Sequence, residues 1–135
     1  MEQFQPQIGL IGTAHWTVGT QHLAEALGNP GVRVLATPML LDLMEVAAHN
    51  ALIEVLPNDW VSLGMSATLQ HLRPTPVGFH VWAQATVVGV DRQKVDFEVT
   101  VYDDQELVGL AQHSRFCLPR VELERRIAAK QAARR

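Results

Sequence analysis

Three ionisable side chains lie within the apolar segment that runs from Val34 to Leu52. Drawn as an α-helix, the segment places Asp42, Glu45 and His49 within an arc of about 60°, so they share one face. A carboxylate inside an apolar element must be paired, hydrogen-bonded or protonated, and burial raises its pKa toward the value that a general base needs. The same stripe also fits a face that meets water or the polar groups of a partner subunit. The spacing leaves both interpretations of Glu45 open.

Two further residues are of types that can act with Glu45. Thr37 stands directly before Pro38, where its hydroxyl either caps a helix or lies beside free amides that hold an anionic oxygen. His71 ends the apolar face of a predicted strand, where it is either a core histidine or an acid/base partner of Glu45. Neither spacing nor composition decides between these roles.

The helix that carries these residues is predicted to begin at Thr37 and Pro38 and to end near Leu56, before the sequence PND. Apolar residues surround most of this helix, so a flat, one-sided sheet cannot bury it. The sequence from Trp60 to Leu118 favours antiparallel strands separated by the turn sequences RPTPVG, VDRQK and DDQE. We therefore predict an α+β fold in which a strongly curved antiparallel sheet wraps around one long central helix.

Alternation along the predicted strands indicates which side chains face that helix. The inward face of the strand 60–72 is predicted to carry Val61, Leu63, Met65, Ala67, Leu69 and His71. The inward face of the strand 94–103 is predicted to carry Val95, Phe97, Val99 and Val101. In the last strand, His113 and Arg115 are predicted to lie on the same side. They are either a hydrogen-bonded pair that supports the sheet or groups near a substrate or a subunit interface.

The flanking segments complete the prediction. Residues 7–18 favour a first strand, and residues 19–28 favour a short helix that ends at Gly28. Residues 120–135 are charged and rich in alanine, which predicts a solvated C-terminal helix that frays at its end. A curved sheet of this size leaves edges and apolar surface for a partner, so a homodimer is expected.

Length and composition indicate one domain that spans residues 1–135. The formal net charge of −3 provides no positive field for nucleic acid. Cys117 is the one cysteine, which excludes an internal disulfide. No signal-like start and no apolar run of membrane length are found, so a cytoplasmic protein without a membrane partner is expected. The histidines lack a spacing such as H-E-x-x-H, and we expect no metal site.

Three motifs follow one another over roughly Val34 to Phe116: ATPMLLDLMEVAAHNAL, SLGMSATLQHLRPTPVGFHVWAQATV and GLAQHSRF. In order and spacing they resemble the hotdog thioesterases related to fluoroacetyl-CoA thioesterase. The resemblance implies a hotdog fold and hydrolysis of an acyl-CoA thioester to a carboxylate and a free thiol. It also implies that Thr37, Glu45 and His71 form the catalytic set.

The same resemblance places the backbone amide of Gly64 beside the thioester carbonyl, where it can stabilise a developing oxyanion. It adds Pro38, His113 and Arg115 to the substrate-binding residues. Coenzyme A enters only as part of the substrate, and no separate cofactor is implied. The partners expected are therefore the acyl-CoA substrate and a second copy of the chain, with assembly beyond a dimer left open.

Helix geometry constrains this site. Eight residues of α-helix rise about 12 Å, so Thr37 and Glu45 on one straight helix cannot easily contact the same atom. Either the helix proper starts after Thr37 and the chain folds back, or the site combines residues of two subunits. Both solutions favour a site at a dimer interface.

Departures from the family pattern limit the substrate prediction. The segment GNPGVRVLATP has no aromatic residue that can cover a fluorinated acyl group, so a general short or medium acyl-CoA is expected instead. Two alternatives are a non-catalytic acyl-CoA-binding hotdog protein and a hotdog enoyl-CoA hydratase, although the hydratase arrangement D-x-N-P-x-H is missing. The basic C-terminal tail has a minor alternative role, which is to attract the phosphates of coenzyme A.

Overall fold

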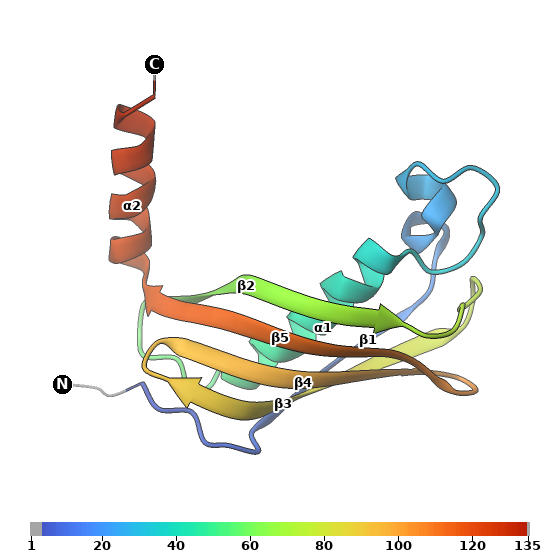
Figure 1. Ribbon diagram of the computed structural model, residues 1–135, viewed down its shortest axis with the longest axis horizontal. Helices are drawn as coiled ribbons and strands as arrows, with labels where there is room; N and C mark the ends of the chain where they lie inside the picture. The colour runs from blue at the N-terminus through green and yellow to red at the C-terminus, as the bar shows by residue number, and fades with distance from the viewer. Residues whose placement is uncertain (1–3, 135) are drawn as a thin grey trace.

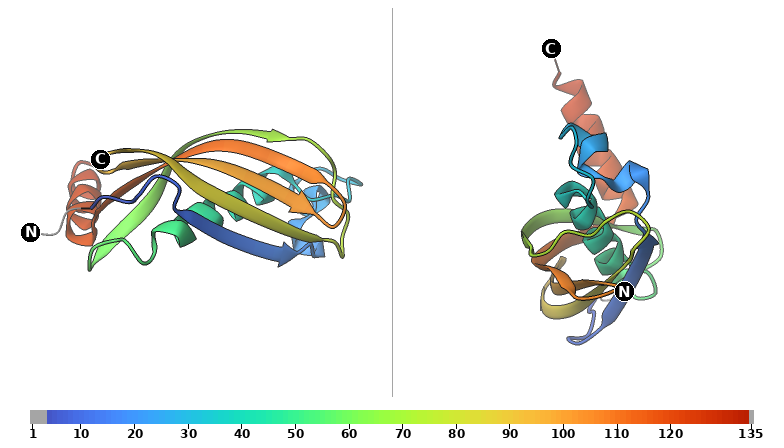
Figure 2. Two further views of the ribbon diagram at one scale, coloured as in Figure 1. Left: turned by 90° about the horizontal axis from the view of Figure 1, so that it is seen from below. Right: turned by 90° about the vertical axis from the view of Figure 1, so that its right-hand side faces the viewer.

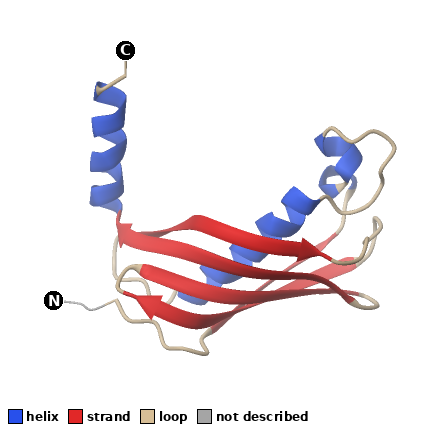
Figure 3. Cartoon of the chain, in the orientation of Figure 1, coloured by secondary structure: helices blue, strands red, loops and turns tan. Residues whose placement is uncertain are grey.

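The computed structural model describes residues 4–134 of the chain. One long helix lies against a single sheet, and a second helix follows the last strand (Figures 1 and 3). The elements, in chain order, are β1 Ile11–Thr17, η1 Thr20–His22, η2 Ala24–Leu27, α1 Thr37–Leu52, β2 Trp60–His71, β3 His80–Asp91, β4 Lys94–Asp103, β5 Leu107–Pro119 and α2 Arg120–Ala132.

The sheet has five strands in the order β1-β3-β4-β5-β2, and all its pairings are antiparallel. Figure 2 shows that the sheet curls around α1, which lies in its concave side. The predicted α+β architecture, a curved antiparallel sheet wrapped around one long helix, is therefore confirmed. The connections that join β3 to β4 and β4 to β5 are the two short turns expected from the sequence.

The core lies between α1 and the concave face of the sheet. The helix buries Leu40, Leu43, Met44, Ala47, Ala48, Ala51 and Leu52. The inward residues predicted for β4 are all buried, and each of these apolar side chains contributes about 2 kcal/mol to stability. A Cβ atom on Gly12 would lie 2.2 Å from the carbonyl oxygen of Ala47, so a glycine is required where β1 crosses α1.

The predicted start of α1 at Thr37 is confirmed, whereas its predicted cap and its predicted end differ from the structure. Ala36 occupies the N-cap position, and no side chain caps the helix, so the predicted capping role of Thr37 is wrong. Thr37 is itself helical, and its hydroxyl is hydrogen-bonded to His71. The helix ends at Leu52 rather than near Leu56, where the amide of Val55 bonds only three residues back, to the carbonyl oxygen of Leu52, and so tightens the chain into a turn.

The predicted inward face of β2 is correct for only half of the strand. The pairing of β2 with β5 shifts between Gly64 and Ser66, as expected for a β-bulge at Met65. One extra residue reverses the faces, so Ser62 is buried whereas Leu63 and Met65 are exposed at 36% and 52%. Beyond the bulge, the inward face predicted for Ala67, Leu69 and His71 agrees with the register, which pairs Ala67 with the buried His113.

The second helix, α2, stands apart from the sheet. It has no buried residue and leaves the end of β5 beyond the edge strand β2 (Figures 1 and 2). Its predicted position is confirmed, and its side chains are solvated as expected. Among the described helices none is both long enough and apolar enough to cross a membrane.

Candidate functional site

The predicted site residues form two separate groups. Glu45, Gly64 and Arg115 meet near the middle of β2, and this group together with Ser62 and His113 is termed the Glu45 cluster. Thr37 and His71 meet at the end of β2 and are termed the Thr37–His71 pair. Pro38 lies in the first turn of α1, directly after Thr37.

The carboxylate of Glu45 lies directly against the backbone of Gly64. A Cβ atom at position 64 would stand 2.1 Å from Oε2 of Glu45, so only glycine leaves room for this carboxylate. Arg115 Nη1 donates a hydrogen bond to the same oxygen over 3.3 Å. The Glu45 side chain is 39% exposed in the single chain, so of the two interpretations left open by the sequence, a face that meets water or a partner fits one chain better than a buried carboxylate.

Arg115 is held from three directions. Its Nε donates to Ser62 Oγ over 2.5 Å, and its Nη2 donates to the Ser62 carbonyl over 3.1 Å. Nη1 lies 3.2 Å from Nε2 of His113, whose Nδ1 lies 2.8 Å from the carbonyl oxygen of Ser66. A carbonyl only accepts, so Nδ1 carries the proton and Nε2 accepts from the guanidinium. The side chain that contacts Glu45 is therefore fixed in one orientation.

Burial explains the protonation of this cluster. It lowers the pKa of His113, while the Ser66 carbonyl opposes that shift, so the imidazole is neutral as the hydrogen bonds require. Burial also lowers the pKa of Arg115, and the Glu45 carboxylate opposes this shift, but a guanidinium stays charged at neutral pH. The interpretation of His113 and Arg115 as a hydrogen-bonded pair that supports the sheet fits this geometry, and the pair additionally orients Glu45.

The Thr37–His71 pair is less enclosed. Thr37 Oγ1 lies 2.8 Å from Nδ1 of His71. The other ring nitrogen, Nε2, is shielded from solvent and has no hydrogen-bond partner among the described residues 4–134. Burial lowers the pKa of His71, although the backbone of Arg73 partly opposes the shift, so the neutral imidazole predominates at pH 7. A neutral imidazole with one free nitrogen can accept or donate a proton.

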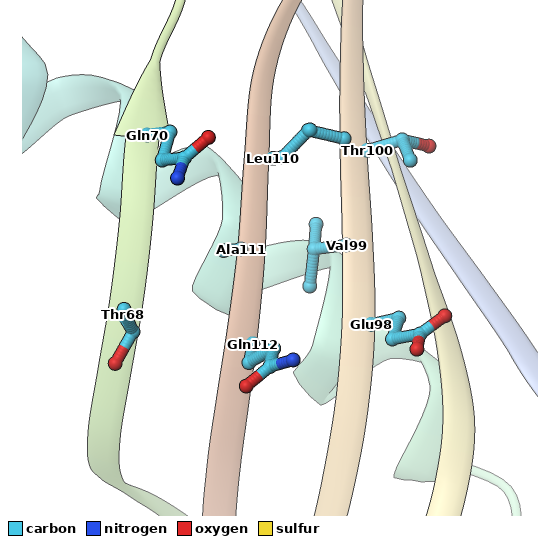
Figure 4. A pocket seen from close by; sticks show the side chains of 8 residues that line it. All are labelled: Thr68, Gln70, Glu98, Val99, Thr100, Leu110, Ala111 and Gln112. Atoms are coloured by element: carbon cyan, nitrogen blue, oxygen red, sulfur yellow. The ribbon is translucent and has the colours of Figure 1, made fainter.

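A cavity of about 330 Å³ adjoins the Thr37–His71 pair. Its walls come from the segment before α1 and from the end of β2, and they are Ala24, Asn29, Val32, Val34, Leu35, Ala36, Thr37, His71, Leu72, Arg73 and Pro74. A second hollow of about 370 Å³ lies on the face of the sheet opposite α1, lined from β2, β4 and β5 (Figure 4). None of the predicted site residues lines that outer hollow.

The structure does not bring the two groups together within one chain. Helix α1 is continuous from Thr37 to Leu52, so Thr37 and Glu45 are separated by about 12 Å along its axis. The possibility that the helix starts after Thr37 is therefore wrong. His71 and Gly64 are likewise seven residues apart along β2, whose pairing with β5 covers both.

Ser62 lies near the site, and its contacts were not predicted from the sequence. Ser62 binds Arg115 through both its hydroxyl and its carbonyl oxygen, and the only sequence signal for it was a small polar residue two positions before Gly64.

His49 is half-buried on the same helix face as Glu45, and both burial and the charge of Arg115 lower its pKa. Asp42, the third member of the predicted stripe, is exposed. No group of three metal-ligating side chains occurs within the described part of the chain.

The chain matches a family model described as fluoroacetyl-CoA-specific thioesterase over residues 18–121. A solved variant of the fluoroacetyl-CoA-specific thioesterase FlK has 23% identity and a TM-score of 0.85, over 92% of this chain and 96% of that one. A hypothetical protein of Thermus thermophilus, described as a thioesterase superfamily member, has 22% identity and a TM-score of 0.86, over 96% and 98% of the two chains.

A hot-dog-like protein of Thermanaerovibrio acidaminovorans has 21% identity and a TM-score of 0.86, and the match covers 94% of each chain. At these identities the solved structures establish the shared fold, which is the hotdog fold predicted above. No curated protein matches the chain in sequence.

Proposed function

Because the chain belongs to the family of the fluoroacetyl-CoA-specific thioesterase, and is thus a thioester hydrolase, we propose that it hydrolyses a short or medium acyl-CoA at a site built by two subunits. The observation that carries the two-subunit site is the separation of the Glu45 cluster from the Thr37–His71 pair. Each group holds part of the predicted catalytic set, and one continuous helix keeps them apart.

The free edge of β2 supports pairing with a second copy. At the opposite edge of the sheet, the side chain of Asn50 donates to the carbonyl oxygen of Thr13 and so covers part of β1. On β2, Leu63 and Met65 are neighbouring apolar side chains that are exposed at 36% and 52%, as on a surface that a partner covers. An unpaired edge strand with apolar side chains is a template for another strand.

Symmetry decides how two β2 strands pair. A two-fold axis along the strands would make the two β2 strands parallel and set each N–H opposite the N–H of the same residue in the partner subunit. A two-fold axis perpendicular to the sheet makes the two strands antiparallel, so that they can exchange hydrogen bonds. If Gly64 lies opposite His71 of the partner subunit, the axis passes between Ala67 and Thr68. Glu45, which contacts Gly64, then lies near the end of the partner subunit's β2, where the Thr37–His71 pair of that subunit is found.

The chemistry of these residues suits thioester hydrolysis. The Glu45 carboxylate either attacks the thioester carbon directly or removes a proton from a water molecule that attacks it. The family resemblance assigns the amide of Gly64 as a donor to the oxyanion, and the contact of the Glu45 carboxylate with the Gly64 backbone supports this role. Thr37 of the partner subunit orients the attacking group. On the general-base route, the proton that Glu45 takes from water passes through the neutral His71 beside Thr37 to the departing thiolate. On the direct route the thiolate leaves first, and water then hydrolyses the acyl–Glu45 anhydride and supplies the proton that the thiolate takes up.

The test is a thiol-release assay over acyl-CoA esters of increasing chain length. We expect turnover that is greatest for short and medium chains and that falls by about 10²- to 10³-fold in Glu45→Gln, because the amide is neither a base nor a nucleophile. Sedimentation of the wild-type protein is expected to give a dimer. Full turnover in a folded Glu45→Gln variant, activity of a strictly monomeric protein, or hydration of crotonyl-CoA in place of hydrolysis would contradict the proposal.

A further inference from the structure

Positive charge is concentrated in the last helix of this acidic chain. Residues 120–135 hold six of the eleven Lys and Arg residues and only two acidic residues. The first 119 residues hold five Lys and Arg residues against twelve Asp and Glu residues. Most of the molecule therefore repels a ligand with several phosphate groups, and α2 attracts it.

The charges of α2 are not neutralised within the helix. Glu122 is shared by Arg125 and Arg126, so one carboxylate faces two guanidinium groups. Lys130 and Arg134 have no acidic partner among residues 4–134. All four basic side chains lie on exposed residues and remain available to an anion.

The cations near the Thr37–His71 cavity are in a different state: Arg73 lines the cavity, and Arg33 lies in sequence between its wall residues Val32 and Val34. Arg33 is paired with Glu25, and Arg73 lies 3.6 Å from Glu106. Each of these cations has a carboxylate of its own, so the cavity within one chain offers little net positive charge to a phosphate group.

Helix α2 cannot serve the cavity of its own chain. Arg120 is anchored to Asp59 through its backbone amide and its side chain, at the end of β2 where Trp60 pairs with Pro119. His71 stands at the opposite end of this twelve-residue strand, about 36 Å away. The helix is about 20 Å long and leads away from the sheet.

Helix α2 and the η1–η2 segment both extend beyond the free edge of β2, from opposite ends of that strand (Figures 1 and 2). A two-fold axis perpendicular to the sheet at this edge exchanges the two ends. It sets α2 of one subunit beside the η1–η2 segment and the cavity of the other. From this arrangement we infer that α2 binds the phosphate groups of the coenzyme A moiety of a substrate held in the partner subunit's cavity. This inference rests on the proposed acyl-CoA thioesterase function.

The first test separates phosphate binding from catalysis. Arg125→Gln/Arg126→Gln is expected to raise KM for an acyl-CoA about threefold to tenfold at low salt, with kcat unchanged. The same variant is expected to leave KM unchanged for the matching N-acetylcysteamine thioester, which lacks phosphates. The control Arg92→Gln/Lys94→Gln removes one cation from the turn between β3 and β4 and one from the first residue of β4, and it is expected to change neither KM. Equal KM values for acyl-CoA in the α2 variant and the wild type would overturn the inference.

Titration calorimetry with free coenzyme A measures the same contact without turnover. A dissociation constant raised about threefold to tenfold in the α2 variant supports the inference, and an unchanged constant overturns it. This readout holds even if no thioester is hydrolysed, which would instead reject the proposed function.

Mixed dimers test whether α2 acts on the partner subunit. One chain carries Thr37→Ala with α2 intact, and the other carries Arg125→Gln/Arg126→Gln with Thr37 intact. The remaining active site then combines an intact Thr37–His71 pair with the intact α2 of the other chain, so wild-type KM is expected. A KM as high as that of the double-variant homodimer would show that α2 acts within its own chain and would overturn the inference.

Discussion

The Glu45 cluster and the Thr37–His71 pair differ in how far one chain satisfies their polar atoms. In the cluster, Arg115 has partners on all three of its nitrogens, and His113 uses both ring nitrogens. In the pair, His71 uses Nδ1 alone, and Nε2 is shielded without a partner in the described chain. The fold of one chain therefore satisfies the polar atoms of the first group, whereas in the second group it leaves Nε2 of His71 without a partner among residues 4–134.

This difference separates residues that contribute to both stability and activity from residues that contribute to activity alone. The buried guanidinium of Arg115, with 8% of its side chain exposed, contributes to stability and orientation together. The exposed Thr37 contributes little to stability, because it neither caps the helix nor packs in the core. Substitutions in the cluster should thus change folding and activity, and substitutions in the pair should change activity alone.

After Glu45→Gln, the largest expected effect comes from Gly64→Ala. The added Cβ atom meets the end of the Glu45 side chain, which can rotate away, so the free energy of unfolding should fall by no more than about 1 kcal/mol. The carboxylate is displaced, however, and a misplacement of about 1 Å lowers kcat on the order of a hundredfold. Steady-state kinetics and thermal unfolding of the same preparation measure both effects.

Gly89→Ala is the matched control for that variant, because its Cβ atom would meet only the Asp96 side chain on β4. We expect near wild-type kcat for Gly89→Ala. A loss of activity as large as that of Gly64→Ala would mean that any alanine in these strands disturbs the enzyme, and the special role of Gly64 would be wrong.

A paired substitution of two hydroxyl residues sharpens the comparison directly. Ser62→Ala leaves the buried Nε of Arg115 without its acceptor and is expected to lower the free energy of unfolding by about 1–3 kcal/mol. Thr37→Ala is expected to change the free energy of unfolding by less than about 0.5 kcal/mol while lowering kcat about tenfold or more. Urea unfolding and thiol release provide the two measurements. Equal destabilisation by the two variants would remove the distinction between the groups.

The smallest expected effect is on pH dependence. Burial lowers the pKa of His71 from the ordinary value of 6.5, so the neutral imidazole persists below that pH. We expect kcat/KM to stay level as pH falls through 6.5 and to decline only at lower pH. A decline centred at or above pH 6.5 would contradict the assignment of the neutral His71 to catalysis.

The same shifts predict a change in stability. Burial lowers the pKa of His49, His71 and His113 in the folded chain, so the unfolded chain binds more protons below pH 6.5. The free energy of unfolding should therefore fall as pH drops below 6.5, and chemical denaturation across this range measures the decline.

Much of the fold was predictable because it depends on local pattern. Alternation in β4 identified its buried face, and the turn sequences placed the hairpins correctly. The reversal of faces in β2 was not predictable, since one bulged residue at Met65 changes which side chains face α1 while leaving the alternation intact. The site was predictable as a set of residue types, but not as a set of contacts.

The sequence by itself determined the long apolar helix, the antiparallel strands around it and the residue types that suit thioester chemistry. These features follow from the periods of helix and strand, which a chain carries in its local order. Only the tertiary structure decided that Thr37 binds His71 and that Arg115 binds Ser62 and Glu45, because these partners lie 34, 53 and 70 residues apart. Their contacts depend on sheet register and on the angle at which α1 crosses the strands, and no single segment of the sequence determines the register or the angle.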